Sequence, residues 1–274
     1  MIGKYFLASL VVVCTLGMSA CETVQTTSPG AVGIQRKQRM LVSEEQVEKG
    51  AAEAYAQELS KAREKGVLNK DKDLTARVRA ISERLIPQTA VFRPDAPSWN
   101  WEINTLTTND LNAYAMPGGK IMVYTGLVER LKLTDAELAA VIGHEIAHAL
   151  REHSRERISR VYAQQIALAG VAAVTGASGG ALDLANAVAS VTFQLPHSRE
   201  QESEADIIGM ELMARAGYDP NAAVSVWKKM IAAEQSGGGP EFLSTHPNPQ
   251  NRIRELQALV PKVEPLYQAA TRRD

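Results

Sequence analysis

Residues 134–160 read TDAELAAVIGHEIAHALREHSRERISR, and the interpretation of the whole chain starts from this stretch. Thr134 and Glu137 form a capping box, in which each side chain accepts a hydrogen bond from the other residue's backbone N–H at the start of a helix. We therefore expect a helix that begins after Thr134 and continues to about Arg160. It carries the pattern HEIAH at residues 144–148.

The HEIAH pattern is typical of a zinc site. His144 and His148 are four residues apart, which is about 40° around a helix, so their side chains point the same way, one turn apart. Two such imidazoles can share one zinc ion at about 2.0–2.1 Å each. Glu145 is rotated by about 100° and lies beside the metal, where its carboxylate can take a proton from a zinc-bound water. The pattern predicts one zinc ion per chain and a catalytic base.

A catalytic zinc needs a third protein ligand, and this helix does not offer one. His153 lies nine residues beyond His144, roughly 180° around the expected helix, so it is predicted to face away. The ligand must therefore come from elsewhere. The best source is a second expected helix over residues 199–216, because it begins with several glutamates.

Three glutamates compete for the role of third ligand, namely Glu200, Glu202 and Glu204. Glu202 heads a face of small and apolar residues that is suited to burial, whereas Glu204 leads towards a charged face that is expected to be solvated. Glu200 lies at the frayed start of the helix. Glu202 is therefore favoured. Asp206, one turn further on, could accept a hydrogen bond from a ligand histidine and fix its tautomer.

The motifs that point to a family are His144-Glu-x-x-His148, Ser198-Arg199-x-x-Glu202-x-x-Ala205-Asp206, Asn112-Ala-Tyr-Ala-x-Pro-Gly-Gly and Thr245-His246-Pro247. Together they resemble the zinc metallopeptidase family of CAAX prenyl proteases and HtpX, and most closely its periplasmic lipoprotein branch, the LoiP-like and BepA-like type. The resemblance implies that Glu202 is the third zinc ligand and that Asp206 supports the site or donates a proton. It also implies endoproteolysis of misfolded or misassembled envelope proteins, with outer-membrane assembly machinery as a possible partner.

Two residues near the C-terminus have open roles. His246 precedes Pro247, so it can be a plain turn residue at the entrance of a helix. In BepA-like relatives, however, a matching histidine can occupy the fourth zinc position and hold the enzyme inactive, and the glycines at 237–239 would let such a loop move. Arg252 could steady the oxyanion of a tetrahedral intermediate, but the sequence does not decide this.

The whole-chain composition sets limits on the function. The chain has 274 residues, 45% of them hydrophobic, which suits one domain with extensions and a proper core without disulfides. The formal charge of −1 argues against the basic patch that a nucleic-acid surface needs. Nucleic acid is therefore not expected as a partner, and the composition does not identify a substrate.

The remaining patterns predict a mainly helical α+β domain of the zincin-like type, with a small antiparallel sheet next to the HEXXH helix. Residues 99–103 alternate as in a strand, and residues 112–116 and 120–124 flank a Pro-Gly-Gly hairpin signal. Tyr114 lies in that hairpin, which is either an edge that an extended peptide can join or a plain core hairpin. Further helices are expected over residues 44–65, 72–86, 220–234 and 249–259.

The N-terminus has the features of a bacterial lipoprotein. Residues 1–20 combine a basic start with a short apolar run, and the sequence Met-Ser-Ala-Cys21 resembles a lipobox, in which the cysteine is acylated. The alternative is an ordinary signal peptide. Residues 21–43 are predicted to be the lipidated cysteine and a flexible tether, and residues 44–274 the metalloprotease domain. Glu22, in place of an aspartate, favours by resemblance the periplasmic inner leaflet of the outer membrane.

Residues 161–195 are rich in Ala, Val and Gly, and Asp183 is their only charged residue. Soluble helices over a cleft are favoured here over a membrane-inserting hairpin, because a glycine-rich break leaves pieces too short to span a bilayer.

The predicted function is that of a zinc metalloendopeptidase that cleaves polypeptides of the cell envelope. One alternative is a chaperone or assembly factor with a latent, His-gated zinc site. Another is a zinc hydrolase of non-peptide bonds.

Overall fold

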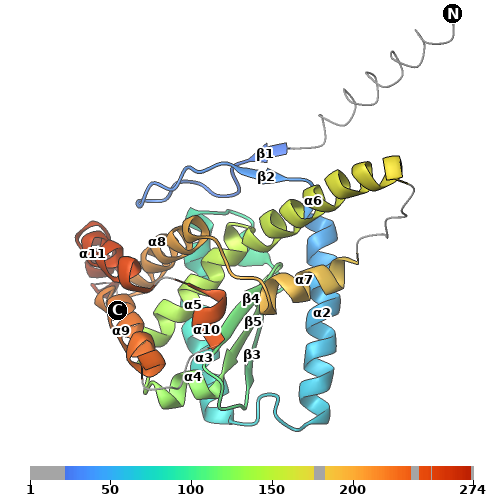
Figure 1. Cartoon of the computed structure of the whole chain (residues 1–274). Coiled ribbons are helices and arrows are strands. Elements are labelled where there is room, and N and C mark those ends of the chain that lie inside the picture. The colour runs from blue at the N-terminus through green and yellow to red at the C-terminus, as the bar shows by residue number, and fades with distance from the viewer. Residues whose placement is uncertain (1–21, 176–182, 236–240, 248, 273–274) are drawn as a thin grey trace, which may run out of the picture.

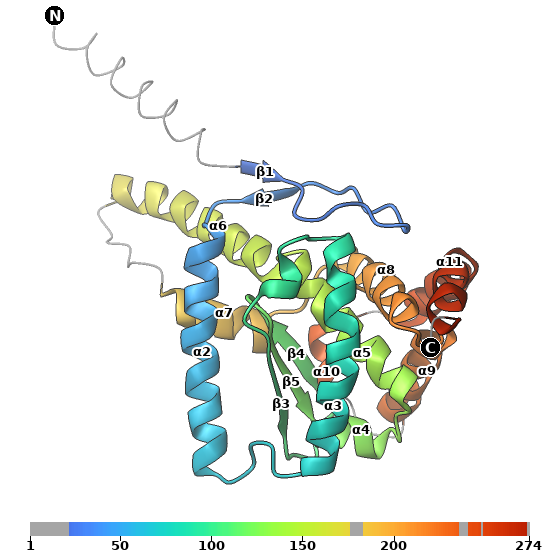
Figure 2. The same ribbon diagram turned by 180° about the vertical axis from the view of Figure 1, so that it is seen from behind.

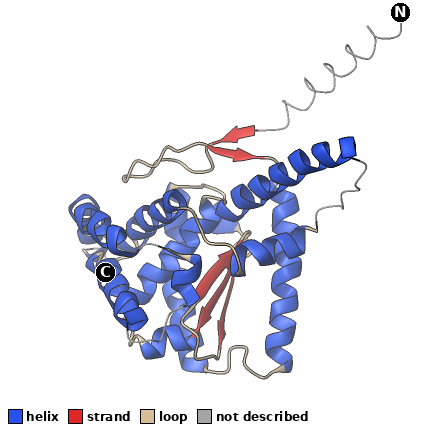
Figure 3. Ribbon diagram, viewed as in Figure 1, coloured by secondary structure: helices blue, strands red, loops and turns tan. Residues whose placement is uncertain are grey.

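The computed structural model describes residues 22–175, 183–235, 241–247 and 249–272. Helices dominate it, and the strands form two small sheets (Figures 1 and 3). The predicted class, a mainly helical α+β domain, is confirmed. Cys21 and the segment before it lie outside the described residues, so the signal peptide and the lipid attachment stay predictions.

The larger sheet has three strands in the order β3 (Glu102–Leu106), β5 (Lys120–Tyr124) and β4 (Ala113–Met116). β4 and β5 form the predicted antiparallel hairpin, whose turn places Gly118 and Gly119 at φ values of 73° and 79°, where glycine is favoured. β3 instead pairs in parallel with β5, so the prediction of a wholly antiparallel sheet is wrong at this strand. The cause is the connectivity, because the chain reverses before β4 and again after it.

The three-stranded sheet separates two parts of the apolar core. On one side lie α3 (Lys72–Leu85) and α5 (Asp135–Leu150), and on the other lie α2 (Glu44–Glu64) and α7 (Leu184–Phe193), as Figure 2 shows for α2, α3 and α5. Ala115 and Ile121 belong to the first part, whereas Tyr114 and Met122 belong to the second. This alternation is that of a strand covered on both faces. Shorter elements border the sheet, namely η2 (Ile86–Val91), η3 (Ala96–Ser98) and α4 (Thr125–Arg130).

Helix α5, which carries the HEXXH pattern, packs along α8 (Arg199–Arg215). The two backbones come close at Gly143 and Gly209, where a Cβ added to Gly209 would lie 2.7 Å from the backbone nitrogen of His144. Almost all of α5 is buried. Three further helices complete this side of the molecule, namely α9 (Asn221–Gln235), α10 (Glu241–Thr245) and α11 (Pro249–Thr271).

Helix α5 begins at the predicted capping box but ends at Leu150, about ten residues earlier than expected. The break lies at Glu152, whose φ of 50° is in the left-handed region. Helix α6 (His153–Thr175) then starts in a new direction. The break matters for the site, because it removes His153 from the helical phase that predicted it would face away.

Residues 22–43 differ from the flexible tether that the sequence predicted. They form an antiparallel hairpin of β1 (Glu22–Val24) and β2 (Gln38–Met40), whose long connecting loop lies across α6 and α8 (Figure 1). Backbone N–H groups of the loop donate to Glu211, and Arg36 pairs with carboxylates of both helices. Composition suggested flexibility, but these buried charges fix the segment in place.

The apolar segment 161–195 forms the rest of α6 and, after residues 176–182, which are not described, helix α7. Among the described residues, no helix is both long and apolar enough to cross a membrane. Helix α7 packs against α2 and the sheet rather than standing alone.

Candidate metal centre

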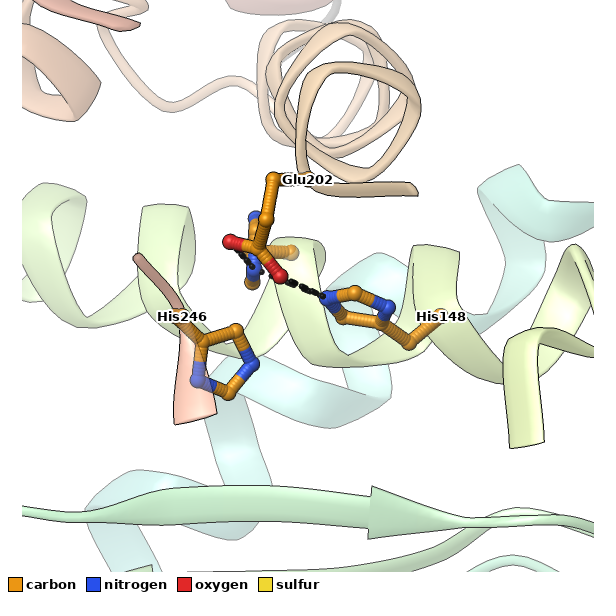
Figure 4. Close-up of side chains that lie close together, drawn as sticks. His148, Glu202 and His246 are labelled. Carbon is orange, nitrogen blue, oxygen red and sulfur yellow. Dashed lines mark hydrogen bonds and ion pairs between the residues drawn. The ribbon is translucent and has the colours of Figure 1, made fainter. Parts of the chain in front are cut away.

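The predicted ligands meet between α5 and α8 (Figure 4). His144 and His148 direct their Nε2 atoms towards each other at a distance of 3.0 Å. Glu202 places Oε1 3.4 Å from Nε2 of His148 and Oε2 3.7 Å from Nε2 of His144. His246, directly after α10, completes a set of four ligand atoms that all lie within 4.8 Å of one another.

This donor set fits a zinc ion. Oε1 of Glu202 and Nε2 of His246 are buried and lack a hydrogen-bond partner among the described residues. Tetrahedral zinc with zinc–nitrogen distances of about 2.0–2.1 Å would separate two histidine nitrogens by about 3.3 Å, close to the 3.0 Å between His144 and His148. Imidazole and carboxylate are also ligands that zinc prefers. His144, His148 and Glu202 would therefore hold the metal, with His246 beside them.

Asp206 orients the first ligand, as the sequence predicted it could. Its Oδ1 lies 3.1 Å from Nδ1 of His144, so the proton is on Nδ1 and the Nε2 lone pair is free for a metal. Arg252 donates to Asp206 at 2.5 and 2.6 Å and also to Glu202, while its guanidinium lies 3.6 Å from the ring centre of Trp227. Burial opposes ionisation of Asp206, but Arg252 outweighs it and lowers the pKa of Asp206 to about 2.

Burial shifts the pKa values of the ligands in the directions expected for groups that leave water. It raises the pKa of Glu202 to about 8, an effect that Arg252 offsets only in part. It also lowers the pKa of His144 and His148, so both imidazoles are held neutral. Neutral imidazoles are the form that binds metal, and a bound cation would stabilise the buried carboxylate.

Glu145 lies where a catalytic base is needed. Its Oε2 accepts the backbone N–H of Ala115, on strand β4, at 3.1 Å. Its Oε1 has no hydrogen-bond partner among the described residues and lies 3.5 Å from Nε2 of His246. Burial, and then the nearby charge of Glu202, raises the pKa of Glu145 well above its usual value. Such a carboxyl group binds a proton more readily than an exposed one does.

Two predictions about neighbouring residues are wrong. Glu204 is buried rather than solvated, because residues 22–43 cover that face of α8, and it pairs with Arg36, Arg151 and His153. These partners hold the pKa of Glu204 well below its usual range, although burial acts the other way. His153, which is predicted to face away from the site, is fully buried beside it, and its Nδ1 lies 2.8 Å from Nδ1 of His148.

A small pocket next to His148 lies between strand β4 and the residues around His197 and His246. β4 is an edge strand of its sheet, but all its residues, the ring of Tyr114 included, are buried. The backbone N–H groups of Ala113 and Ala115 donate to side-chain oxygens of Asn112 and Glu145. The ring of His197 lies 3.9 Å, centre to centre, from that of His148, and Arg157 contacts it at 2.8 Å. His197 therefore packs beside the site.

The family comparison agrees with this geometry. A model described as "Peptidase family M48" matches residues 72–260. The chain belongs to peptidase family M48. The metallopeptidase resemblance drawn from the motifs is thereby confirmed.

The relatives that resemble this chain include mitochondrial metalloendopeptidases and bacterial proteases. It is 39% identical over 165 residues to the mitochondrial metalloendopeptidase OMA1 of Schizosaccharomyces pombe, a match that covers 60% of this chain and 48% of that protein. The OMA1 metalloendopeptidase of Bos taurus is 35% identical over 196 residues, or 68% and 37% of the two chains. The β-barrel assembly-enhancing protease of Escherichia coli is 27% identical over 178 residues, or 59% and 34%. The chain thus spans less than half the length of these relatives.

Sequence reasoning missed the residues that surround the ligands. The sequence suggests a role for Arg252 only at an oxyanion, whereas in the structure Arg252 donates to two carboxylates, Asp206 and Glu202. The prediction that His153 faces away is wrong because α5 ends at Leu150, before His153. The left-handed residue Glu152 gave no sequence signal, since glycine or asparagine usually marks such a position.

Proposed function

We propose that the chain is a zinc-dependent endopeptidase. The observation that carries the proposal is the convergence of His144, His148 and Glu202 on one buried point, with the carboxyl group of Glu145 beside it. Three protein ligands with an additional carboxylate are typical of catalytic rather than structural zinc sites. Membership of a peptidase family supports the same reaction.

The mechanism follows from the positions of the chain's own groups. A zinc ion at this site would supply a water of lowered pKa and polarise the scissile carbonyl. Glu145 accepts the proton of the attacking water and delivers it to the leaving amine, a role suited to its raised pKa. Asp206 holds His144 in the required tautomer. The edge of β4, one residue of which already bonds Glu145, binds the substrate as an extended strand.

The proposed substrates are misfolded or misassembled proteins of a bacterial cell envelope. Relatives in Escherichia coli and Vibrio cholerae are named as β-barrel assembly-enhancing proteases, which supports this setting. We further propose that acylated Cys21 anchors the chain at the inner leaflet of the outer membrane, near the assembly machinery. The OMA1 relatives show that the same type of domain also occurs in mitochondria.

A second candidate function is an assembly factor whose zinc site is latent. The observation in its favour is His246, whose Nε2 lies within the ligand set and 3.5 Å from Glu145. A histidine in that place would compete with the catalytic water. Replacing His246 with Ala would then raise basal cleavage, whereas unchanged cleavage and zinc affinity would contradict the gating role.

The test of the proposed function uses residues 22–274, purified without lipid. Zinc content and casein cleavage are compared for the wild type, Glu145→Gln and the exposed control Glu129→Gln. We expect one zinc per chain in all three and a loss of cleavage of about 100-fold or more in Glu145→Gln alone. Zinc without cleavage in every form would favour the latent assembly factor. Absence of zinc from the wild type would refute both functions.

A further inference from the structure

The two histidine ligands have different hydrogen-bond partners at Nδ1. His144 has a carboxylate, Asp206, at its Nδ1. In the described part of the chain no carboxylate bonds Nδ1 of His148, which instead faces Nδ1 of His153 at 2.8 Å. Two facing ring nitrogens form a hydrogen bond only when one carries a proton and the other a lone pair. The direction of this bond therefore decides which nitrogen of His148 can bind a metal.

The surroundings of His153 determine that direction. Its other nitrogen, Nε2, lies 3.1 Å from Oε2 of Glu204. Glu204 also accepts hydrogen bonds from Nε of Arg36 at 2.6 Å and from Nε of Arg151 at 3.0 Å. A carboxylate paired with two guanidinium groups accepts hydrogen bonds only. Nε2 of His153 must therefore carry a proton, and in the neutral ring Nδ1 keeps its lone pair.

The same reasoning extends to His148. Since Nδ1 of His153 accepts, Nδ1 of His148 must donate, and the Nε2 of His148 is left with a lone pair. That Nε2 is the atom that faces His144 and Glu202. Because His153 is fully buried, solvent does not compete for this bond.

We propose that His153 is a positioning residue of the metal centre, which accepts the Nδ1–H of His148 and so directs the Nε2 lone pair of His148 at the metal. This inference rests on the proposed zinc centre. The hydrogen bonds from Arg36 to Glu204, from His153 to Glu204 and from His148 to His153 then connect the N-terminal segment with a metal ligand. Residues 22–43 then contribute to the site, although they lie before the part of the chain that matches the family.

The test compares His153→Leu with His153→Asn. The two replacements have nearly the same shape, and both lose the contact with Glu204. Only Asn offers an oxygen near the position of the original Nδ1, so only Asn can accept from His148. Any defect that arises merely from lost volume or from the lost contact with Glu204 is shared by both variants.

Zinc affinity, measured by competition with a chelator, is the first readout. We expect His153→Leu to bind zinc about 10–100-fold more weakly than the wild type, as is usual when the partner of a ligand histidine is removed. His153→Asn should recover about tenfold of that loss. Equal zinc affinities of the Leu and Asn variants, whether normal or reduced, would overturn the proposal.

The second readout is the tautomer of His148 in the metal-free wild type, observed by long-range ¹H–¹⁵N NMR. The chain has five histidines, which keeps the assignment tractable. A proton on Nδ1 of His148 supports the proposal, and a proton on Nε2 contradicts it. This measurement needs neither zinc nor a variant that folds. A wild type that binds no zinc would refute the proposed function, while the tautomer would still test the role of His153.

Discussion

At the scale of single residues, the metal centre depends on the balance of a few buried charges. Glu202 and Asp206 both accept hydrogen bonds from the guanidinium of Arg252. Removal of one partner from a buried ion network leaves the others without compensation in a medium that solvates them poorly. Arg252 therefore stabilises the ligand set, and its donors face these carboxylates rather than a substrate oxyanion.

Replacing Arg252 with Met should strongly destabilise the metal-free protein. We expect the free energy of unfolding to fall by about 3–5 kcal/mol, because the ionised Asp206 loses its counter-charge and Glu202 loses a hydrogen-bond donor. Zinc should reduce the difference, since it supplies positive charge to Glu202. Denaturant unfolding with and without zinc measures both effects. Arg254→Met, an exposed position on the same helix, is the control, and an equal loss there would contradict this role.

At the residue scale, the sequence predicts the candidate ligands and one of their partners, Asp206, but not the other residues that surround them. His144, Glu145 and His148 follow from helical spacing alone, and Glu202 follows from the apolar face that it heads. The burial of Glu204 could not be predicted, because the residues that cover it lie more than 150 positions away. Periodicity reports which face of a helix is polar. It does not report whether another segment pairs with those polar groups.

At the scale of helices and strands, the centre depends on how closely α5 and α8 approach. Gly143 and Gly209 let the two backbones meet, and this contact places Glu202 of α8 opposite the histidines of α5. The position of the ligands is thus a property of a helix pair, and a small separation of the helices would move Glu202 away from both imidazoles.

Gly209→Ala tests this packing. The added Cβ would lie 2.7 Å from the backbone nitrogen of His144, and backbone atoms cannot move aside as the tip of a side chain can. We expect a loss of stability of about 1–3 kcal/mol, together with weaker zinc binding. Ser203→Ala, on the same helix, should change stability by no more than about 0.5 kcal/mol. Thermal unfolding and chelator competition measure the two quantities, and normal zinc affinity in Gly209→Ala would contradict the argument.

The elements themselves were predicted well where local signals were strong. The capping box at Thr134 begins a helix in the structure, and the helices expected from residues 44 and 199 begin there. Helix ends were predicted less well, because the break after Leu150 has no glycine or proline to mark it. The parallel pairing of β3 with β5 was also missed, since a strand pattern indicates which residues alternate but not the direction of the neighbour.

At the scale of the whole molecule, the N-terminal segment 22–43 is part of the domain rather than a spacer. Arg36 bonds Glu156 and Glu204 and so joins the loop to α6 and α8. Gln38 lies buried beside them. Composition favoured a tether because Thr, Ser, Gly and Gln dominate the segment. Only the tertiary structure shows that the polar side chains of this segment bind buried charges.

This network makes stability depend on acid pH. Burial opposes ionisation of Glu156, but hydrogen bonds from Arg36, Gln201 and Gln38 outweigh it and lower the pKa of Glu156 from 4.5 to about 2. A folded-state pKa below the unfolded value gives stability that is complete above pH 4.5 and is lost as pH falls towards 2. Arg36→Ala should reduce this loss between pH 5 and 3 compared with Arg39→Ala, an exposed control in the same segment, as measured by denaturant unfolding. Identical pH profiles would contradict it.

The most direct test of the whole account is the position of the metal. Crystals of residues 22–274 with zinc would be measured at the zinc absorption edge, where the anomalous signal locates the ion independently of any assumed ligands. We predict one peak, about 2.0–2.2 Å from Nε2 of His144, Nε2 of His148 and the carboxylate of Glu202. A peak elsewhere, or no peak in protein shown to contain zinc in solution, would contradict the central claim.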